Sequence, residues 1–216
     1  MVALTPRDHR LHAIGGHGLD PATVQPPATR AAHRSEPLPI TGAHPPLVAI
    51  VGAHGGAGTS TLARWWAPAA DCEQRWPASP DTTQRVVIAA RLCLPGLIAC
   101  ADRLREWIFG AAPAGVEVIG VVLAAARPGA VPAAVRRYRA TIADLTELVW
   151  EIGWHNELVE RELGELAQFT PFTPAPPRRS GLTEAVPADV HRAGSELIAA
   201  LATSLKTATE EQDSEK

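Results

Sequence analysis

The feature that most constrains this chain is a glycine-rich turn between an apolar run and a helix start. Residues 47–51 (LVAIV) form a short continuous apolar segment, the pattern of a strand that is buried on both faces. They lead into residues 52–58 (GAHGGAG), and the residues from Thr59 onward favour a helix that Pro68 limits. A strand that enters a helix through such a turn predicts an α/β fold, with the turn at the C-terminal edge of a sheet.

Three further apolar segments of strand length follow, at residues 86–90, 116–123 and 148–152. They alternate with segments in which apolar residues recur every three or four positions, at residues 95–109, 131–145, 158–168 and 190–205. Strands that are apolar on both faces are typical of a parallel sheet that is covered on two sides. The sequence therefore predicts a compact α/β fold with a mainly parallel sheet of about four to five strands flanked by helices.

The rest of the chain divides by composition. Residues 1–44 are rich in Pro, Gly, Ala, Arg and His without periodicity, which predicts a disordered arm before the α/β domain at residues 45–168. Residues 169–187 are a proline-rich crossing. We expect residues 188–206 to form a C-terminal helix packed on the domain, and residues 207–216 to be a flexible acidic tail.

Bulk properties exclude several classes of function. The net charge of -3 gives no basic footprint for nucleic acid. No apolar run approaches the roughly 20 residues of a membrane helix. Cys72, Cys93 and Cys100 lack metal-ligand spacing, and an odd set of this kind is typical of reduced thiols in a cytoplasmic protein.

The turn has a chemical interpretation as well as a structural one. Glycines let backbone N–H groups approach phosphate oxygens, a lysine reaches the terminal phosphates, and a Ser or Thr hydroxyl holds Mg²⁺. The glycines and the hydroxyl are present here, but the only lysines in the chain are Lys206 and Lys216. The alternative is a strand-to-helix turn that needs glycine only for packing.

Residues 54–63 (HGGAGTSTLA) resemble the P-loop of the ParA/MinD family, whose pattern is Lys-Gly-Gly-x-Gly-Lys-[Ser/Thr]-Thr. They read closest to its lysine-less CpaE/TadZ-like members. The resemblance implies phosphate contacts from Gly55, Gly56 and Gly58, with Ser60 as the magnesium ligand. The loop positions that complete the pattern are Ala57 and Thr61, with His54 and Thr59 in the places of the two lysines.

The same resemblance implies a truncated P-loop NTPase-like fold that lacks several features of the family. The family has a strand that ends in an aspartate between positions equivalent to Ser60 and Val86, and we expect that strand to be deleted here. The third apolar strand lacks the adenine-reading Asn, which leaves base selectivity open. Arg91, at a strand end, is the best substitute cation. Residues 148–159 resemble the family's last core strand, where Trp154 or His155 either faces a ligand or is a half-buried edge residue.

The implied function is a nucleotide- or phosphate-binding regulatory or localisation component of a plasmid, conjugation, secretion or chromosome-positioning system. Its cofactor would be ATP or another nucleotide with Mg²⁺. Efficient hydrolysis is not expected, because phosphoryl transfer depends on positioned charge. The alternatives are an active ATPase with an atypical catalytic set and a structural adaptor whose loop binds nothing. A protein partner is expected, and a homodimer is left open.

Overall fold

The computed structural model describes residues 30–177 and 180–214, with side chains described as far as Ser204. The fold is α/β, as the sequence predicts. Its main sheet has five strands, all parallel, in the order β3-β2-β5-β6-β7. In chain order these strands are β2 (Val48–Gly52), β3 (Ala69–Asp71), β5 (Arg85–Leu92), β6 (Glu117–Ala125) and β7 (Val149–Ile152). The four segments expected to be strands thus all lie in this one sheet.

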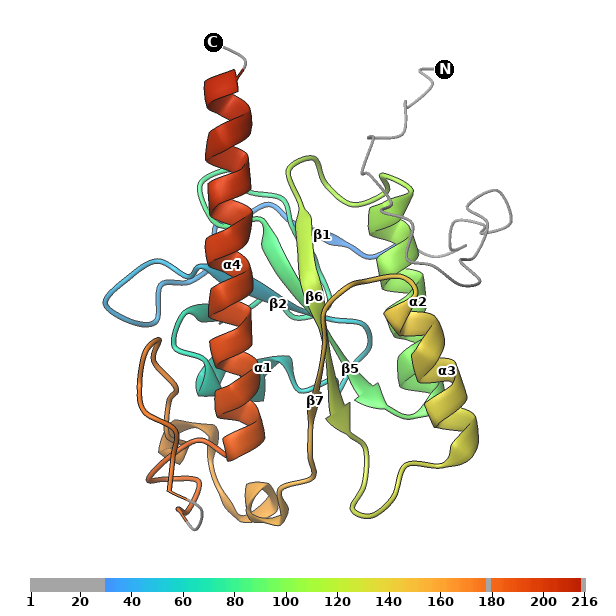
Figure 1. Ribbon diagram of the computed structural model, residues 1–216, viewed down its shortest axis with the longest axis vertical. Coiled ribbons are helices and arrows are strands. Elements are labelled where there is room, and N and C mark those ends of the chain that lie inside the picture. Colours follow the sequence, from blue (N-terminus) through green and yellow to red (C-terminus); the bar gives the residue numbers. More distant parts are fainter. Residues whose placement is uncertain (1–29, 178–179, 215–216) are drawn as a thin grey trace.

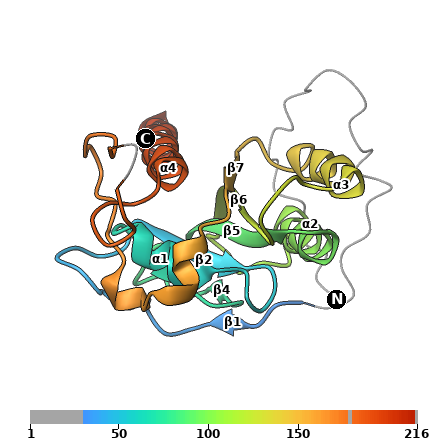
Figure 2. The same cartoon turned by 90° about the horizontal axis from the view of Figure 1, so that it is seen from below.

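Helices cover both faces of the sheet (Figures 1 and 2). On one side lie α1 (Thr59–Trp65) and α4 (Ala188–Ser214), and on the other lie α2 (Leu94–Ile108) and α3 (Ala133–Ala143). Successive residues of β2 explain this division. Val48 and Ile50 join the apolar core beside α1 and α4, whereas Ala49 and Val51 join the core beneath α2 and α3. Both apolar faces of β2 are therefore covered, one by each layer of helices.

Helix α4 is longer than expected. It continues to Ser214, beyond the predicted end at residue 206, and Figure 1 shows its later turns extending past the sheet. The buried residues of α4 are Val190, Ala193, Leu197 and Leu201, which follow helical spacing along its first half. The first half of α4 thus packs on the domain, and the helix continues through residues 207–214 of the segment that the sequence predicts to be a flexible tail.

Residues 30–44 differ from the predicted disordered arm. β1 (His33–Arg34) pairs in parallel with β4 (Trp76–Pro77), and Leu38 is buried in the core. Glu106 of α2 explains the attachment, because its buried carboxylate accepts hydrogen bonds from the Ala31 N–H and the Trp76 indole. Composition gave no sign of these long-range contacts. Residues 1–29 of the predicted arm lie outside the described residues.

The helix expected at residues 158–168 is wrong. Two short 3₁₀ helices stand in its place, η2 (Asn156–Glu160) and η3 (Leu163–Glu165). Glu162 starts the second helix through a reciprocal capping box with Glu165, which interrupts any continuous helix. The crossing then runs along the end of α1, where the Phe169 N–H donates to the Trp65 carbonyl at 2.7 Å.

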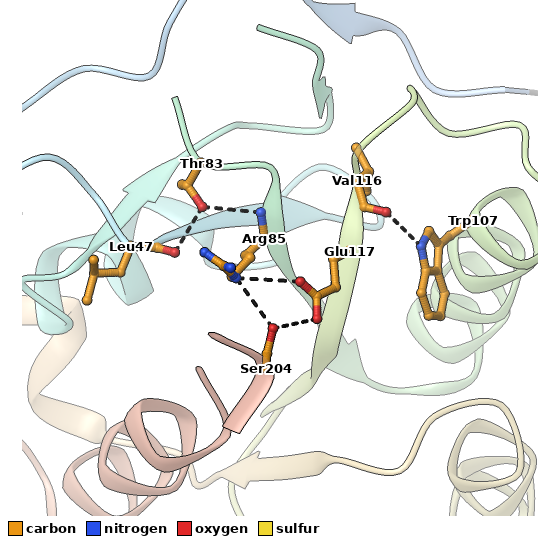
Figure 3. A network of polar contacts seen from close by, with 7 residues as sticks. All are labelled: Leu47, Thr83, Arg85, Trp107, Val116, Glu117 and Ser204. Atoms are coloured by element: carbon orange, nitrogen blue, oxygen red, sulfur yellow. Dashed lines mark hydrogen bonds and ion pairs between the residues drawn. The ribbon is translucent and has the colours of Figure 1, made fainter. Parts of the chain in front are cut away.

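A polar network joins α4 to the amino-terminal end of the sheet (Figure 3). The Ser204 hydroxyl donates to Glu117 at 2.6 Å, and Glu117 forms an ion pair with Arg85 at 3.5 Å. Thr83, just before β5, accepts the Arg85 N–H and donates to the Leu47 carbonyl. These contacts lie at the opposite end of the strands from the glycine-rich loop, so we assign them a role in stability.

Within the described residues, none of the helices combines the length and the apolar character that crossing a bilayer requires.

Candidate functional site

The strand order singles out one place on the molecule. Numbered by appearance, the five strands run 2-1-3-4-5, so the winding direction reverses between β2 and β5. In open parallel sheets, ligands bind in the crevice outside the carboxyl ends of the strands at this reversal. Here the glycine-rich loop leaves the end of β2, and Arg91 and Leu92 end the neighbouring β5. The loop therefore lies where the fold itself favours a binding site.

The loop needs its glycines for conformation. Gly56 has φ 75° and Gly58 has φ 96°, in the left-handed region that other residues rarely adopt. Position 52 requires glycine for space, because an added Cβ at Gly52 would lie 3.2 Å from the Glu73 carbonyl oxygen. A side chain at Gly55, by contrast, would meet nothing closer than 3.8 Å. Ala57 is buried beneath the turn.

Several backbone N–H groups of the loop remain available. In the part of the chain that the structure describes, the N–H groups of Gly55, Gly56, Gly58, Thr59 and Ser60 donate to no protein acceptor. The Ala57 N–H is engaged by the His54 carbonyl at 3.3 Å. Successive free donors in a turn of left-handed glycines form a concavity that suits an anion. Gly55, Gly56 and Ser60 are exposed to solvent.

His54 acts as a bridge rather than as a free side chain. Its Nε2 accepts the Arg91 backbone N–H at 3.1 Å, so its Nδ1 carries the proton and donates to the Gly55 carbonyl at 2.8 Å. Gly96 makes room for this contact, since a Cβ there would lie 3.1 Å from His54 Nε2 and 2.2 Å from the Arg91 carbonyl oxygen. His54 therefore joins the loop to the end of β5 and does not supply the missing lysine charge.

Arg91, at the end of β5, joins the loop to the end of β6. Its Nε donates to the Gly56 carbonyl at 2.9 Å, and its Nη1 donates to the Ala125 carbonyl at the end of β6 at 3.1 Å. Among the ion pairs of the described residues, none involves Arg91. A guanidinium that is bound only to neutral carbonyls leaves its positive charge uncompensated beside the loop.

The expected deletion of the aspartate-ending strand is wrong. β3 lies between α1 and β5 in the chain. It pairs with β2 and ends in Asp71. The Ser60 hydroxyl donates to Asp71 Oδ2 at 2.5 Å, while Asp71 Oδ1 accepts the Glu73 N–H at 2.7 Å. Sequence reasoning missed β3 because Ala69 and Ala70 are too few and too small to form an apolar run. The signal was an aspartate shortly after the loop helix.

Thr59 and Thr61 have no polar contact with the loop. The methyl group of Thr59 packs toward Gly52, whose added Cβ would approach it to 3.1 Å. The described residues contain no group of three or more His, Cys, Asp and Glu side chains that could hold a metal ion. Ser60 and Asp71 are thus a hydrogen-bonded pair of oxygen-bearing side chains rather than a closed metal centre.

Two cavities open beside the loop, at the carboxyl ends of β5, β6 and β7. The larger, about 500 Å³, is lined by His54, Arg91, Cys93, Pro95, Gly96, Ala126 and Trp154. The smaller, about 320 Å³, has walls that include Arg127, Glu151, Gly153, Trp154 and Asn156. Trp154 lines both, so the two cavities meet at its indole ring. Of the two candidates for facing a ligand, the structure places Trp154 at the crevice.

His155 lies elsewhere. It is half-buried, its ring contacts the edge of Trp65 at 5.8 Å between centroids, and its Nε2 lies 3.3 Å from Asp189 Oδ1. Asp189 also accepts the Gly153 N–H at 2.7 Å, which fastens the start of the Trp154 segment to α4. Burial opposes ionisation of Asp189, but its contacts with His155 and Gly153 outweigh this effect and lower its pKa.

Comparison with known proteins does not identify a family for this chain. The chain matches no family model, no curated protein and no solved structure. The chemistry of the site must therefore be argued from its own residues.

Proposed function

We propose that the chain is a degenerate ParA/MinD-like P-loop protein that binds phosphate or a nucleotide at residues 54–61. One observation carries this proposal, which is the set of unpaired N–H donors between Gly55 and Ser60 at the reversal of the sheet. The start of any helix leaves its first N–H groups unpaired, and this exposed turn adds the free N–H groups of Gly55 and Gly56, an arrangement that suits an anion. Arg91 supports the proposal because its charge is uncompensated.

Ser60 and Asp71 are the residues that would hold Mg²⁺. Both offer oxygen, the ligand that this ion prefers, and they already lie within hydrogen-bond distance of each other. Bound there, the ion would neutralise phosphate charge. The Asp71 carboxylate is itself positioned by the Glu73 N–H, so the pair is oriented before any ligand arrives.

The same residues argue for slow hydrolysis. Phosphoryl transfer is accelerated almost wholly by positioning and by cations on the transferring group. His54 and Thr59 stand where the lysines would be, and His54 is engaged by backbone groups. Arg91 is held by two carbonyls, so reaching a terminal phosphate would require breaking those bonds. We propose a regulatory or localisation role in the cytoplasm, in a plasmid, conjugation, secretion or chromosome-positioning system.

An active ATPase is the second candidate, and the Ser60–Asp71 pair specifically favours it. ATP turnover with Mg²⁺ separates the two candidates. We expect turnover near background in the native protein. Turnover at ordinary ATPase rates that is lost in both Ser60→Ala and Asp71→Asn would instead establish the second candidate.

Calorimetric titration with pyrophosphate, ADP and ATP, each with and without Mg²⁺, tests binding itself. Gly58→Val should abolish binding, because a branched side chain strains the left-handed position and blocks the approach to the donors. Thr59→Lys should tighten binding about 10-fold, the effect of one hydrogen bond to a charged group. Gly42→Val is the control, since Gly42 is exposed and a Cβ there meets open space.

Absence of binding in both the native protein and Thr59→Lys would contradict the proposal. The loop would then be a packing turn and the chain a structural adaptor.

A further inference from the structure

The exposed indole of Trp154 marks a place for a flat ring. Trp154 is 39% exposed at the carboxyl end of a parallel sheet, where both cavities meet. Its Nε1 donates to Asn156 Oδ1 at 2.7 Å, which holds the ring in one orientation. A large aromatic side chain kept partly in water and fixed by a hydrogen bond is suited to stacking against a planar ligand.

The polar groups around this ring are donors. An indole N–H can only donate, so the Asn156 atom that faces it must be the oxygen, and the amide NH₂ is directed to other partners. Within residues 30–177 and 180–214, that NH₂ has no acceptor. Arg127 lines the same cavity, is exposed and forms no ion pair with a described residue.

The one carboxylate in the cavity wall is already paired. Glu151 lines the smaller cavity, and its Oε1 forms an ion pair with Arg139 of α3. The Gly153 N–H is likewise engaged, by Asp189. Glu151 is held by its ion pair with Arg139, and the two other polar side chains of this cavity, the Asn156 amide NH₂ and the Arg127 guanidinium, both donate.

Resting on the nucleotide-binding function proposed above, we propose that this crevice selects a 6-oxopurine, guanine or hypoxanthine, over adenine. A 6-oxopurine presents two acceptors on one edge, O6 and N7, and arginine is a common donor to that pair. Adenine presents an amino donor at the same position, which would face a second donor. With the base on Trp154, the adjoining cavity extends to Arg91 and to His54, the residue that precedes Gly55 of the loop.

Titration of the full-length protein with GDP, IDP, ADP and pyrophosphate, all with Mg²⁺, tests the selection. GDP and IDP should bind with similar affinity, about 10-fold tighter than ADP, as expected for one donor–acceptor match at a base edge. Pyrophosphate has no base, so it reports on the loop alone. Equal affinity for GDP and ADP, or tighter binding of ADP, would overturn the selection.

Variants locate the base. Trp154→Leu should weaken GDP about 10-fold and leave pyrophosphate unchanged, because only stacking is removed. Trp154→Phe should retain most of the GDP affinity, and Asn156→Ala should bring GDP close to ADP. Phe172→Leu is the matched control, since Phe172 is 95% exposed and lines neither cavity.

The pyrophosphate measurement separates the two proposals. If pyrophosphate binds but GDP binds no better, or if Trp154→Leu leaves GDP affinity intact, the base crevice is wrong and the phosphate loop stands. If no compound binds, both proposals fail together.

Discussion

At the scale of single residues, the three cysteines differ in what surrounds them. Burial raises the pKa of the Cys72 thiol to about 11 and that of the Cys100 thiol to about 12. Roughly one in a thousand of these groups, or fewer, is a thiolate at pH 8. Cys93 is half-buried and lines the larger cavity. Accessibility to a reagent therefore differs sharply among three otherwise identical side chains.

We predict that a thiol-reactive disulfide reagent at pH 8 modifies Cys93 alone in the native protein, and all three cysteines in urea. GDP should slow the native reaction, because a nucleotide with its base on Trp154 would occupy the cavity beside Arg91. Mass spectrometry of the labelled peptides identifies the site, and Cys93→Ser should abolish native labelling. Labelling of Cys72 as fast as Cys93 would contradict the burial described here.

The residue scale also shows what sequence reasoning can reach. Gly56 and Gly58 were predictable, because a strand-to-helix turn with several glycines implies left-handed positions. The bridging role of His54 was not, since its partner Arg91 lies 37 positions along the chain. Nothing local marks such a pair. Asp71 could not be predicted as a site residue, because β3, the strand that it ends, is only three residues long.

At the scale of elements, α4 is held against the sheet through a close approach at Gly194. A Cβ there would lie 2.9 Å from Phe169 and from the Trp66 indole nitrogen, whose N–H donates to the Val190 carbonyl. We predict that Gly194→Ala lowers the free energy of unfolding by about 1–2 kcal/mol, since overpacking outweighs the gain in helix propensity. Thermal denaturation measures this change.

The control is Gly42→Ala, where the added Cβ meets open space and stability should stay within about 0.5 kcal/mol. An unchanged melting temperature in Gly194→Ala would mean that α4 does not pack as closely as described.

Asp189 makes a second, pH-dependent attachment of α4. Its lowered pKa means that its ionised form stabilises the folded state above the unfolded value near 3.8, and that this stabilisation is lost as the pH falls through the folded value. We predict that Asp189→Asn costs about 1–2 kcal/mol at pH 7, reduced from the buried case by partial exposure, and less at an acid pH below the folded pKa of Asp189.

Urea denaturation at both pH values measures the difference. Asp102→Asn is the control, because Asp102 is more exposed than Asp189 and, among the described residues, forms an ion pair with Arg105 alone. A cost for Asp189→Asn that does not shrink in acid would exclude the carboxylate as its origin.

Element prediction succeeded where burial is two-sided and failed where it is not. β5 and β6 were evident because their apolar runs are covered on both faces. Residues 158–168 carry apolar residues at helical spacing, at Val159, Leu163 and Leu166, but only Leu166 is fully buried, and Gly164 and the Glu162 cap break the segment. The pairing of β1 with β4 depends on Glu106, which is distant in the chain from both strands.

At the scale of the whole molecule, both cores share the same strands. Trp76 lies in the core beneath α2, while Trp65, Trp66 and Trp150 lie in the core beneath α4. Neither core can lose its strands while the other keeps them. We therefore predict one cooperative unfolding transition, with coincident urea midpoints by tryptophan fluorescence and by far-ultraviolet circular dichroism. A Trp76→Phe variant, whose fluorescence is weighted toward the α4 side, should keep the two probes coincident. Separate midpoints would show that the two layers unfold independently.

The place of α4 in the chain has a consequence for synthesis. Val190, Leu197 and Leu201 cover a sheet face to which β2, the first strand of the main sheet, already contributes Val48 and Ile50. About 140 residues are translated between these partners, which takes roughly 7–30 s at typical rates. Throughout that interval α1 has been translated but α4 has not, so the part of the face that α4 covers stays unshielded on the ribosome-bound chain. The growing polypeptide should therefore be a client for chaperones that recognise apolar surface until α4 emerges.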